Sequence, residues 1–162
     1  MDNCPWKLSV KRKRNKEKKE KKMTEKIKMT MPGNPKYTMV TELAVEAAAV
    51  QAGFDLEAVN DIKLATGEAC KQVICHGFEG WCSCYEVECE TDGEKIVIKI
   101  SETDCGHKVP KKGRICLDCP REGDLSMEII KTLMDETEIK KADSDGEVKK
   151  SIIMTKKKSH NK

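Results

Sequence analysis

The feature that most limits the fold of this chain is an alternation of apolar and charged residues on either side of Asp92-Gly93. Residues 85–90 alternate Tyr, Val and Cys with glutamates, and residues 96–100 place an isoleucine at every second position. Alternation with a period of two predicts half-buried β-strands, and Asp-Gly is a strong signal for a tight hairpin between them. A hairpin with one apolar face needs a second layer to cover it.

The segments before this hairpin predict a further strand and two helices. Residues 26–31 alternate again, and the turn Pro32-Gly33-Asn34-Pro35 separates them from a helix expected over Tyr37–Gln51, which Gly53 ends. A second helix is expected over Leu56–Cys75, because apolar residues recur there at spacings of three and four. The buried stripe of this helix consists of Val59, Ile62, Ala65, Ala69 and Val73.

The segments after the hairpin complete a two-layer architecture. Thr103–Gly123 is polar and predicts a long loop, and Leu125–Met134 predicts a short helix. Glu138–Lys141 and Lys149–Thr155 are expected to pair across Asp145-Gly146 as a last hairpin. Helices on one face of a mixed, mostly antiparallel sheet form an α+β two-layer sandwich, which is the fold class that we expect.

Charge divides the chain into a tail and a domain. Residues 1–22 hold ten of the 31 Lys and Arg residues and three of the 28 Asp and Glu residues, so the remaining 21 basic and 25 acidic residues carry −4. We expect a basic disordered tail at 1–24, one domain at 25–157 and a C-terminal tail at 158–162. The acidic domain argues against a nucleic-acid groove, and no apolar run reaches the roughly 20 residues of a membrane span.

The nine cysteines favour a reducing cytoplasm, because they lack regular spacing and no secretory signal is evident. Within the expected loop, a C-x-H…C-x-x-C pattern offers four soft ligands that could close a tetrahedral zinc site. These ligands are Cys105, His107, Cys116 and Cys119. A dithiol redox pair and ordinary free thiols remain alternatives. Other cysteines are expected to act as small packing residues, namely Cys70, Cys75, Cys82 and Cys84.

The second helix carries the clearest candidate for chemistry. Glu68 and Gln72 are four residues apart and therefore project from one helix face. A carboxylate can take a proton from a hydroxyl nucleophile, and an amide oxygen one turn away can hold Mg²⁺. Such a pair is also common on a solvated helix face, so the spacing alone does not establish a site.

Two motifs in the same order resemble the GHKL ATPases, and among them the anti-sigma-factor serine kinases of the RsbW and SpoIIAB type. The segment Glu68–His76, EACKQVICH, is similar to that family's N-box, E-A-x-x-N-x-x-x-H. The segment Arg121–Ile139, REGDLSMEIIKTLMDETEI, is similar to its R-E-G-G-L-G-L-x-L-I-x-x-L-M-D-E-V motif. The resemblance covers roughly Lys26–Lys156 and implies a Bergerat-type ATP-binding fold with a mobile lid.

The resemblance also implies roles for individual residues. Glu68 takes the position of the general base in the transfer of the γ-phosphate of ATP to a serine of the partner protein. Gln72 takes the position of the Mg²⁺ ligand. Asp104 and Gly106 match the D-x-G motif that reads the adenine amine, and Gly123 opens the second glycine box. The implied partners are a sigma factor and an anti-anti-sigma protein of the STAS type, and a homodimer is common in the family.

Four positions depart from the family pattern. Gln72 is one methylene longer than the usual Asn, and Lys108 replaces the second glycine of D-x-G-x-G. Asp124 and Ser126 stand where glycines let backbone amides approach phosphates. The sequence therefore leaves three functions open: a serine kinase, a partner-binding module without catalysis, and a metal- or redox-sensing switch.

Overall fold

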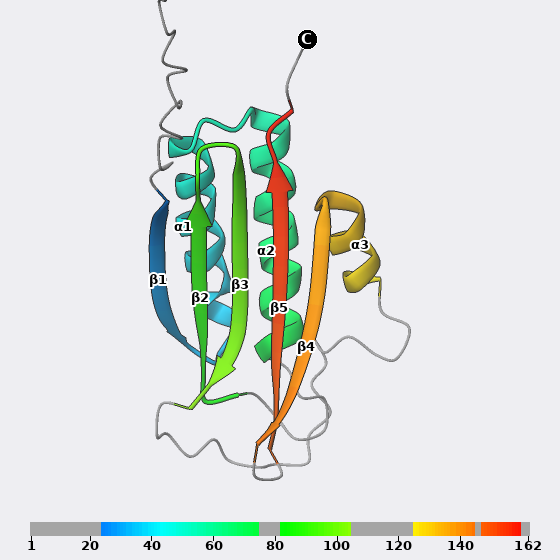
Figure 1. Cartoon of the computed structure of the whole chain (residues 1–162). Helices are drawn as coiled ribbons and strands as arrows, with labels where there is room; N and C mark the ends of the chain where they lie inside the picture. Colours follow the sequence, from blue (N-terminus) through cyan, green and yellow to red (C-terminus); the bar gives the residue numbers. More distant parts are fainter. Residues whose placement is uncertain (1–23, 75–81, 105–124, 145–146, 160–162) are drawn as a thin grey trace, which may run out of the picture.

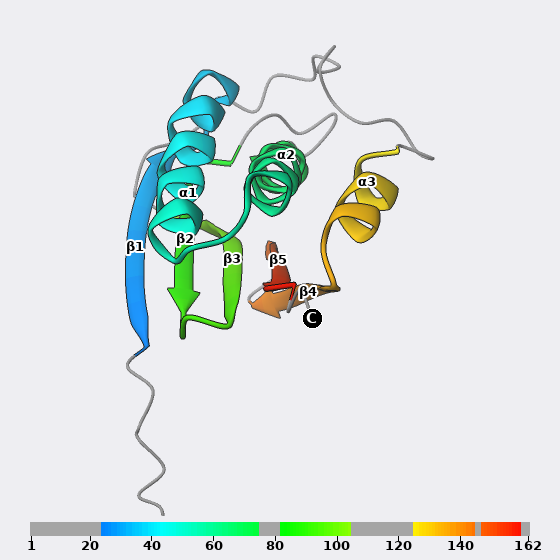
Figure 2. The same ribbon diagram turned by 90° about the horizontal axis from the view of Figure 1, so that it is seen from above.

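The computed structural model describes residues 24–74, 82–104, 125–144 and 147–159, which form two layers (Figure 1). One layer is a five-stranded sheet in the order β1-β2-β3-β5-β4. The helices cover one face of this sheet, as the view from above shows (Figure 2). In chain order the elements are β1 (Glu25–Pro32), the 3-10 turn η1 (Pro35–Tyr37), α1 (Thr38–Gln51), α2 (Leu56–Ile74), β2 (Cys84–Thr91), β3 (Lys95–Thr103), α3 (Ser126–Leu133), β4 (Glu136–Ser144) and β5 (Glu147–Lys157).

The expected α+β two-layer sandwich is confirmed, and the described strands pair antiparallel throughout. The hairpin between β2 and β3 turns at Gly93, whose φ of 84° is a conformation that glycine adopts without strain. Asp92 Oδ1 accepts hydrogen bonds from the backbone of Glu94 and of Lys95, each at 3.0 Å. The last hairpin is longer than the sequence indicates, since β4 begins at Glu136 rather than at Glu138. The sequence of β4 is rich in charged residues, so it lacks the apolar–polar alternation that would have marked its full length.

The turn between α1 and α2 is specified by its own residues. Gly53, at φ 79°, ends α1 in a Schellman motif, in which Gly53 N donates to Val50 O and Phe54 N donates to Ala49 O. Asp55 then caps α2, because its Oδ1 accepts from Ala58 N at 2.8 Å. This turn fixes α2 beside α1 and over the sheet, and so determines which face of α2 remains available.

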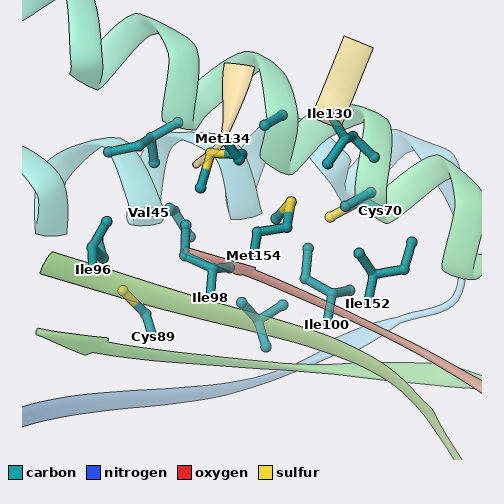
Figure 3. Close-up of a cluster of buried hydrophobic side chains, with 14 of the residues drawn as sticks. Val45, Cys70, Cys89, Ile96, Ile98, Ile100, Ile130, Met134, Ile152 and Met154 are labelled. Carbon is teal, nitrogen blue, oxygen red and sulfur yellow. The ribbon is translucent and has the colours of Figure 1, made fainter. Parts of the chain in front are cut away.

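The core lies between the two layers (Figure 3). Isoleucines from β3 and β5 point toward the helices, and the expected stripe of α2 is buried against them. The α3 helix closes the far side with Ile130 and Met134, which are also buried. The fully buried strand residues at the centre are Ile96, Ile98, Ile100, Ile152 and Met154.

Candidate functional site

Glu68 lies where α2 meets the first turn of α3. Its Oε2 accepts a hydrogen bond from Ser126 Oγ at 2.7 Å, and its Oε1 accepts from Lys71 Nζ at 2.8 Å. The side chain is 21% exposed, whereas that of Lys71 is 50% exposed. The structure therefore brings together two motifs that are 58 residues apart in the chain, with a carboxylate between a hydroxyl and an ammonium group.

Gln72 follows one helical turn later and contacts the sheet. Lys150 of β5 donates from Nζ to Gln72 Oε1 at 3.0 Å and to the Gln72 backbone oxygen at 2.9 Å. Lys150 points toward the helices, because it has the same strand parity as Ile152 and Met154, which are fully buried. The amide oxygen expected to hold a cation is thus in contact with an ammonium group.

Asp104 follows directly after β3, at the same end of the sheet as Lys150. Ser83 Oγ donates to Thr103 O at 3.2 Å and approaches Asp104 Oδ1 at 3.5 Å. The Asp104 side chain is exposed. Asp104 therefore lies at the end of a central strand, and its role in reading adenine stays a prediction.

Next to Glu68, the α2 helix is packed closely against α1. A Cβ atom at Gly67 would overlap the Glu42 carboxylate, so a larger residue there would force the Glu42 side chain to move. Burial raises the pKa of Glu42 above its ordinary value, and the nearby Lys71 and Lys63 offset part of that effect. Glu42 therefore places a second carboxylate close to the charges that surround Glu68.

A buried polar cluster supports the same end of α2. Thr41 Oγ1 and the Tyr85 hydroxyl share a hydrogen bond of 2.8 Å, and Cys70 lies against both groups. Burial raises the pKa of the Cys70 thiol to about 12, so Cys70 is a packing residue, as the sequence indicates. The cluster packs the α2 face opposite to Glu68 against α1 and β2.

Several residues that the sequence singles out lie outside the described residues. They are Gly106, Gly123, Cys105, His107, Cys116 and Cys119. The zinc site therefore stays a prediction; within the described ranges, no three His, Cys, Asp or Glu side chains group in a way that could hold a metal. Cys82 is a free buried thiol, as expected, whereas Cys84 is disulfide-bonded and is more than a packing residue.

Two residues that contact Glu68 or Gln72 are not evident as site residues from the sequence alone. Ser126 stands there as a departure from glycine, and in the structure it donates a hydrogen bond to Glu68. Lys150 lies within the expected strand Lys149–Thr155, and its parity with Ile152 and Met154 places it on the inner face. That parity was a signal available in the sequence.

The arrangement suits a ligand that carries negative charge. Lys71 and Lys150 place ammonium groups on either side of the Glu68–Gln72 helical turn, and the start of α3 faces the same region. A carboxylate within this cationic frame can accept a proton from a hydroxyl. None of the described helices is long and apolar enough to span a membrane.

Comparison with known proteins agrees with this geometry. Residues 31–156 match the histidine kinase-like ATPase domain family. The chain is 26% identical to the serine-protein kinase RsbW of Listeria monocytogenes (strain HCC23) over 135 residues, which cover 72% of this chain and 80% of the relative. It is 30% identical to RsbW of Halalkalibacterium halodurans over 127 residues, 72% of this chain and 76% of the relative. RsbW of Bacillus subtilis is 26% identical over 125 residues, 70% of this chain and 76% of the relative.

Because the family match spans both layers and every described site residue, the chain belongs to the histidine kinase-like ATPase domain family.

Proposed function

We propose that this protein is an anti-sigma-factor-type regulator whose domain binds ATP and slowly transfers the γ-phosphate to a serine of a partner protein. The observation that carries this proposal is the position of Glu68, a partly exposed carboxylate held where α2 meets α3. A general base must be accessible and must lie within reach of the hydroxyl that it deprotonates. The similarity to serine-protein kinases supports the same role.

The residues around Glu68 fit a nucleotide better than they fit a metal ion. Lys71 and Lys150 would supply positive charge for phosphate groups, and we assign to Asp104 the hydrogen bond from the adenine amine. Gly106 and Gly123 would complete the site by letting the backbone approach the nucleotide. The Mg²⁺ ligand position does not fit as it stands, because Gln72 Oε1 already accepts from an ammonium group.

Slow turnover follows from the contacts of the base. Ser126 holds one carboxylate oxygen of Glu68 and Lys71 holds the other. Both contacts stabilise the ionised carboxylate and therefore make it a weaker base, although each oxygen keeps a lone pair for a substrate hydroxyl. Hydrogen bonds to a charged group contribute about 1.5–3 kcal/mol each, and part of this stabilisation is lost when Glu68 accepts a proton, so a glycine at position 126 would lower the barrier.

The surface of α1 supports the partner-binding part of the proposal. Met39, Val40 and Leu43 are 67%, 51% and 52% exposed, which is high for large apolar side chains on one helix. We propose that a sigma factor and a STAS-type anti-anti-sigma protein compete for the domain. A module that binds partners without phosphotransfer is the second candidate, and it is favoured by the occupied oxygens of Glu68.

Substitution of Glu68 by Gln separates these two candidates. If Glu68 is the general base, Glu68→Gln should lower phosphotransfer from ATP to a STAS-domain protein of the same organism by at least about a hundredfold. ATP affinity, measured by titration calorimetry, should change by less than about threefold, because the base and the phosphate-binding groups are different residues.

Ser126→Ala is the matched variant for this experiment. It removes the donor to Glu68 but keeps the Cβ atom, so it should raise the transfer rate several-fold if the hydrogen bond restrains the base. ATP binding without phosphotransfer in either protein would leave the partner-binding module as the function. Absence of ATP binding in the wild type would refute the proposal.

A further inference from the structure

The contact between Lys150 and Gln72 has a chemical consequence for the cation of the nucleotide site. Lys150 Nζ donates to Gln72 Oε1 at 3.0 Å and to Gln72 O at 2.9 Å, so the ammonium group bridges the side chain and the backbone of one residue. Two bonds to a helix terminus hold the lysine more firmly than a single surface contact would. The positive charge is therefore fixed one helical turn from Glu68.

The longer side chain of glutamine explains how this contact forms. Gln72 carries one methylene more than asparagine, which extends its amide oxygen from α2 toward β5. On β5, Lys150 extends the inner row that continues with the buried Ile152 and Met154. The two side chains cross the gap between the layers from opposite directions and meet at the oxygen.

A divalent cation would compete with Lys150 for that oxygen. Mg²⁺ binds oxygens at about 2.0–2.1 Å and tolerates little deviation from octahedral geometry. An ion at Gln72 Oε1 would therefore lie within a few ångströms of the Lys150 ammonium, and the two positive charges would repel each other strongly. Either the lysine or the metal can occupy this position, but not both in the described arrangement.

We propose that Lys150 takes the place of the divalent cation at the N-box residue Gln72, so that the site binds ATP as a metal-free anion. This inference rests on the proposed function, because it assumes that the domain binds nucleotide. It also accounts for slow turnover, since an ammonium group neutralises less phosphate charge than Mg²⁺ does. Lys150 is thus a residue that determines which form of the nucleotide is bound.

The test compares ATP affinity in excess Mg²⁺ with affinity in EDTA, measured by titration calorimetry. Wild-type protein should bind ATP equally well under both conditions, within about threefold. Lys150→Met should lose about tenfold or more in EDTA, the effect expected for removal of one charge-assisted contact, and should become dependent on Mg²⁺. Lys150→Arg should behave like the wild type, because it keeps a cationic donor.

Lys149→Met is the matched control, because Lys149 has the same charge on the same strand but lies on the opposite face. It should leave both affinities unchanged.

A second measurement needs no variant: electron paramagnetic resonance of Mn²⁺ should show no more bound metal with wild-type protein and ATP than with ATP alone. Added Mn²⁺ binding by the complex would overturn the proposal.

The outcomes separate this inference from the proposed function. Wild-type affinity that falls tenfold or more in EDTA would overturn the role of Lys150 while leaving ATP binding established. No ATP binding under either condition would overturn the proposed function, and the Lys150 inference with it. Thermal unfolding of each variant without nucleotide shows whether a loss of affinity reflects a loss of folded protein.

Discussion

The two ends of β5 use the same residue type on the same face in different ways. Lys156, at one end, donates from Nζ to Asp61 Oδ2 at 2.8 Å and to Leu133 O at 2.6 Å. The Lys156 side chain is only 16% exposed and that of Asp61 27%. Lys150, at the other end, contacts the uncharged amide of Gln72. A lysine paired with a carboxylate ties the helix layer to the sheet through opposite charges, whereas the contact of Lys150 with an amide joins the same layers without neutralising its charge.

The largest expected effect concerns the buried thiols. Burial raises the pKa of Cys70 and of Cys82 to about 12, and that of Cys89 to about 11, from an ordinary value of 9.0. The unfolded chain therefore loses these protons first, so the contribution of the thiols to stability is complete well below pH 9 and is lost as the pH rises from 9 through the folded pKa values. Urea unfolding should show a loss of roughly 4 kcal/mol between pH 8 and pH 10, about 1.4 kcal/mol for each thiol.

This measurement also sharpens the comparison between the two ends. Cys70 and Cys82 lie toward the Lys150 end, and Cys89 lies toward the Lys156 end. Cys70→Ala should reduce the slope of unfolding free energy above pH 9 by about 1.4 kcal/mol per pH unit, the value for one thiol. A slope that does not change would mean that Cys70 does not stay protonated in the folded protein.

The next effect tests the difference between the lysines directly. Lys156→Met should lower the free energy of unfolding by about 2 kcal/mol, because it leaves the largely covered Asp61 carboxylate and the Leu133 carbonyl without their donor. Lys150→Met should cost less than about 1 kcal/mol, because the two Gln72 oxygens that lose their donor are uncharged. Urea unfolding at pH 7 measures both changes.

Lys131→Met serves as the control for this pair of variants. Lys131 and Glu128 form an exposed ion pair on α3, with side chains 57% and 69% exposed, and such pairs contribute little. Its unfolding midpoint should match that of the wild type. Equal losses for Lys150→Met and Lys156→Met would remove the distinction between a structural lysine and a site lysine.

The smallest expected effect concerns the cluster that supports the site. Tyr85→Phe removes the hydroxyl that pairs with Thr41 Oγ1 and should cost about 1 kcal/mol, because a buried hydroxyl loses its partner. Combining it with Thr41→Val should cost less than the sum of the single changes, since both groups of the pair are then removed. Additive losses would show that the two hydroxyls do not depend on each other.

Local patterns predicted most of the fold. Asp92-Gly93 and the alternating isoleucines determine the central hairpin, and the turn at Gly53 and Asp55 determines the two helices, because each signal lies within the segment that it shapes. The extent of β4 was underestimated. Its pairing is set by β5 rather than by its own sequence, which is charged and lacks a clear alternation.

The candidate site was predicted less completely than the fold. The position of Glu68 on a helix face followed from spacing, but its contact with Ser126 joins residues that only the tertiary structure brings together. Lys150 lies in a strand that the sequence predicts, and its parity with Ile152 and Met154 indicates the inner face, but its contact with Gln72 again depends on the tertiary structure. For a polar residue at the edge of the core, strand parity predicts which face it lies on, but only the tertiary structure shows which residue it contacts.

The strand order also governs how the protein can fold as it is synthesised. The last strand of the domain, β5, lies between β3 and β4 rather than at the rim of the sheet. While the chain emerges from a ribosome, β3 has no neighbour on one side, and Ile96, Ile98 and Ile100 lack the strand that covers their flank. A chain stalled before residue 147 therefore presents an unpaired apolar edge, which is the kind of surface that chaperones protect and that otherwise aggregates.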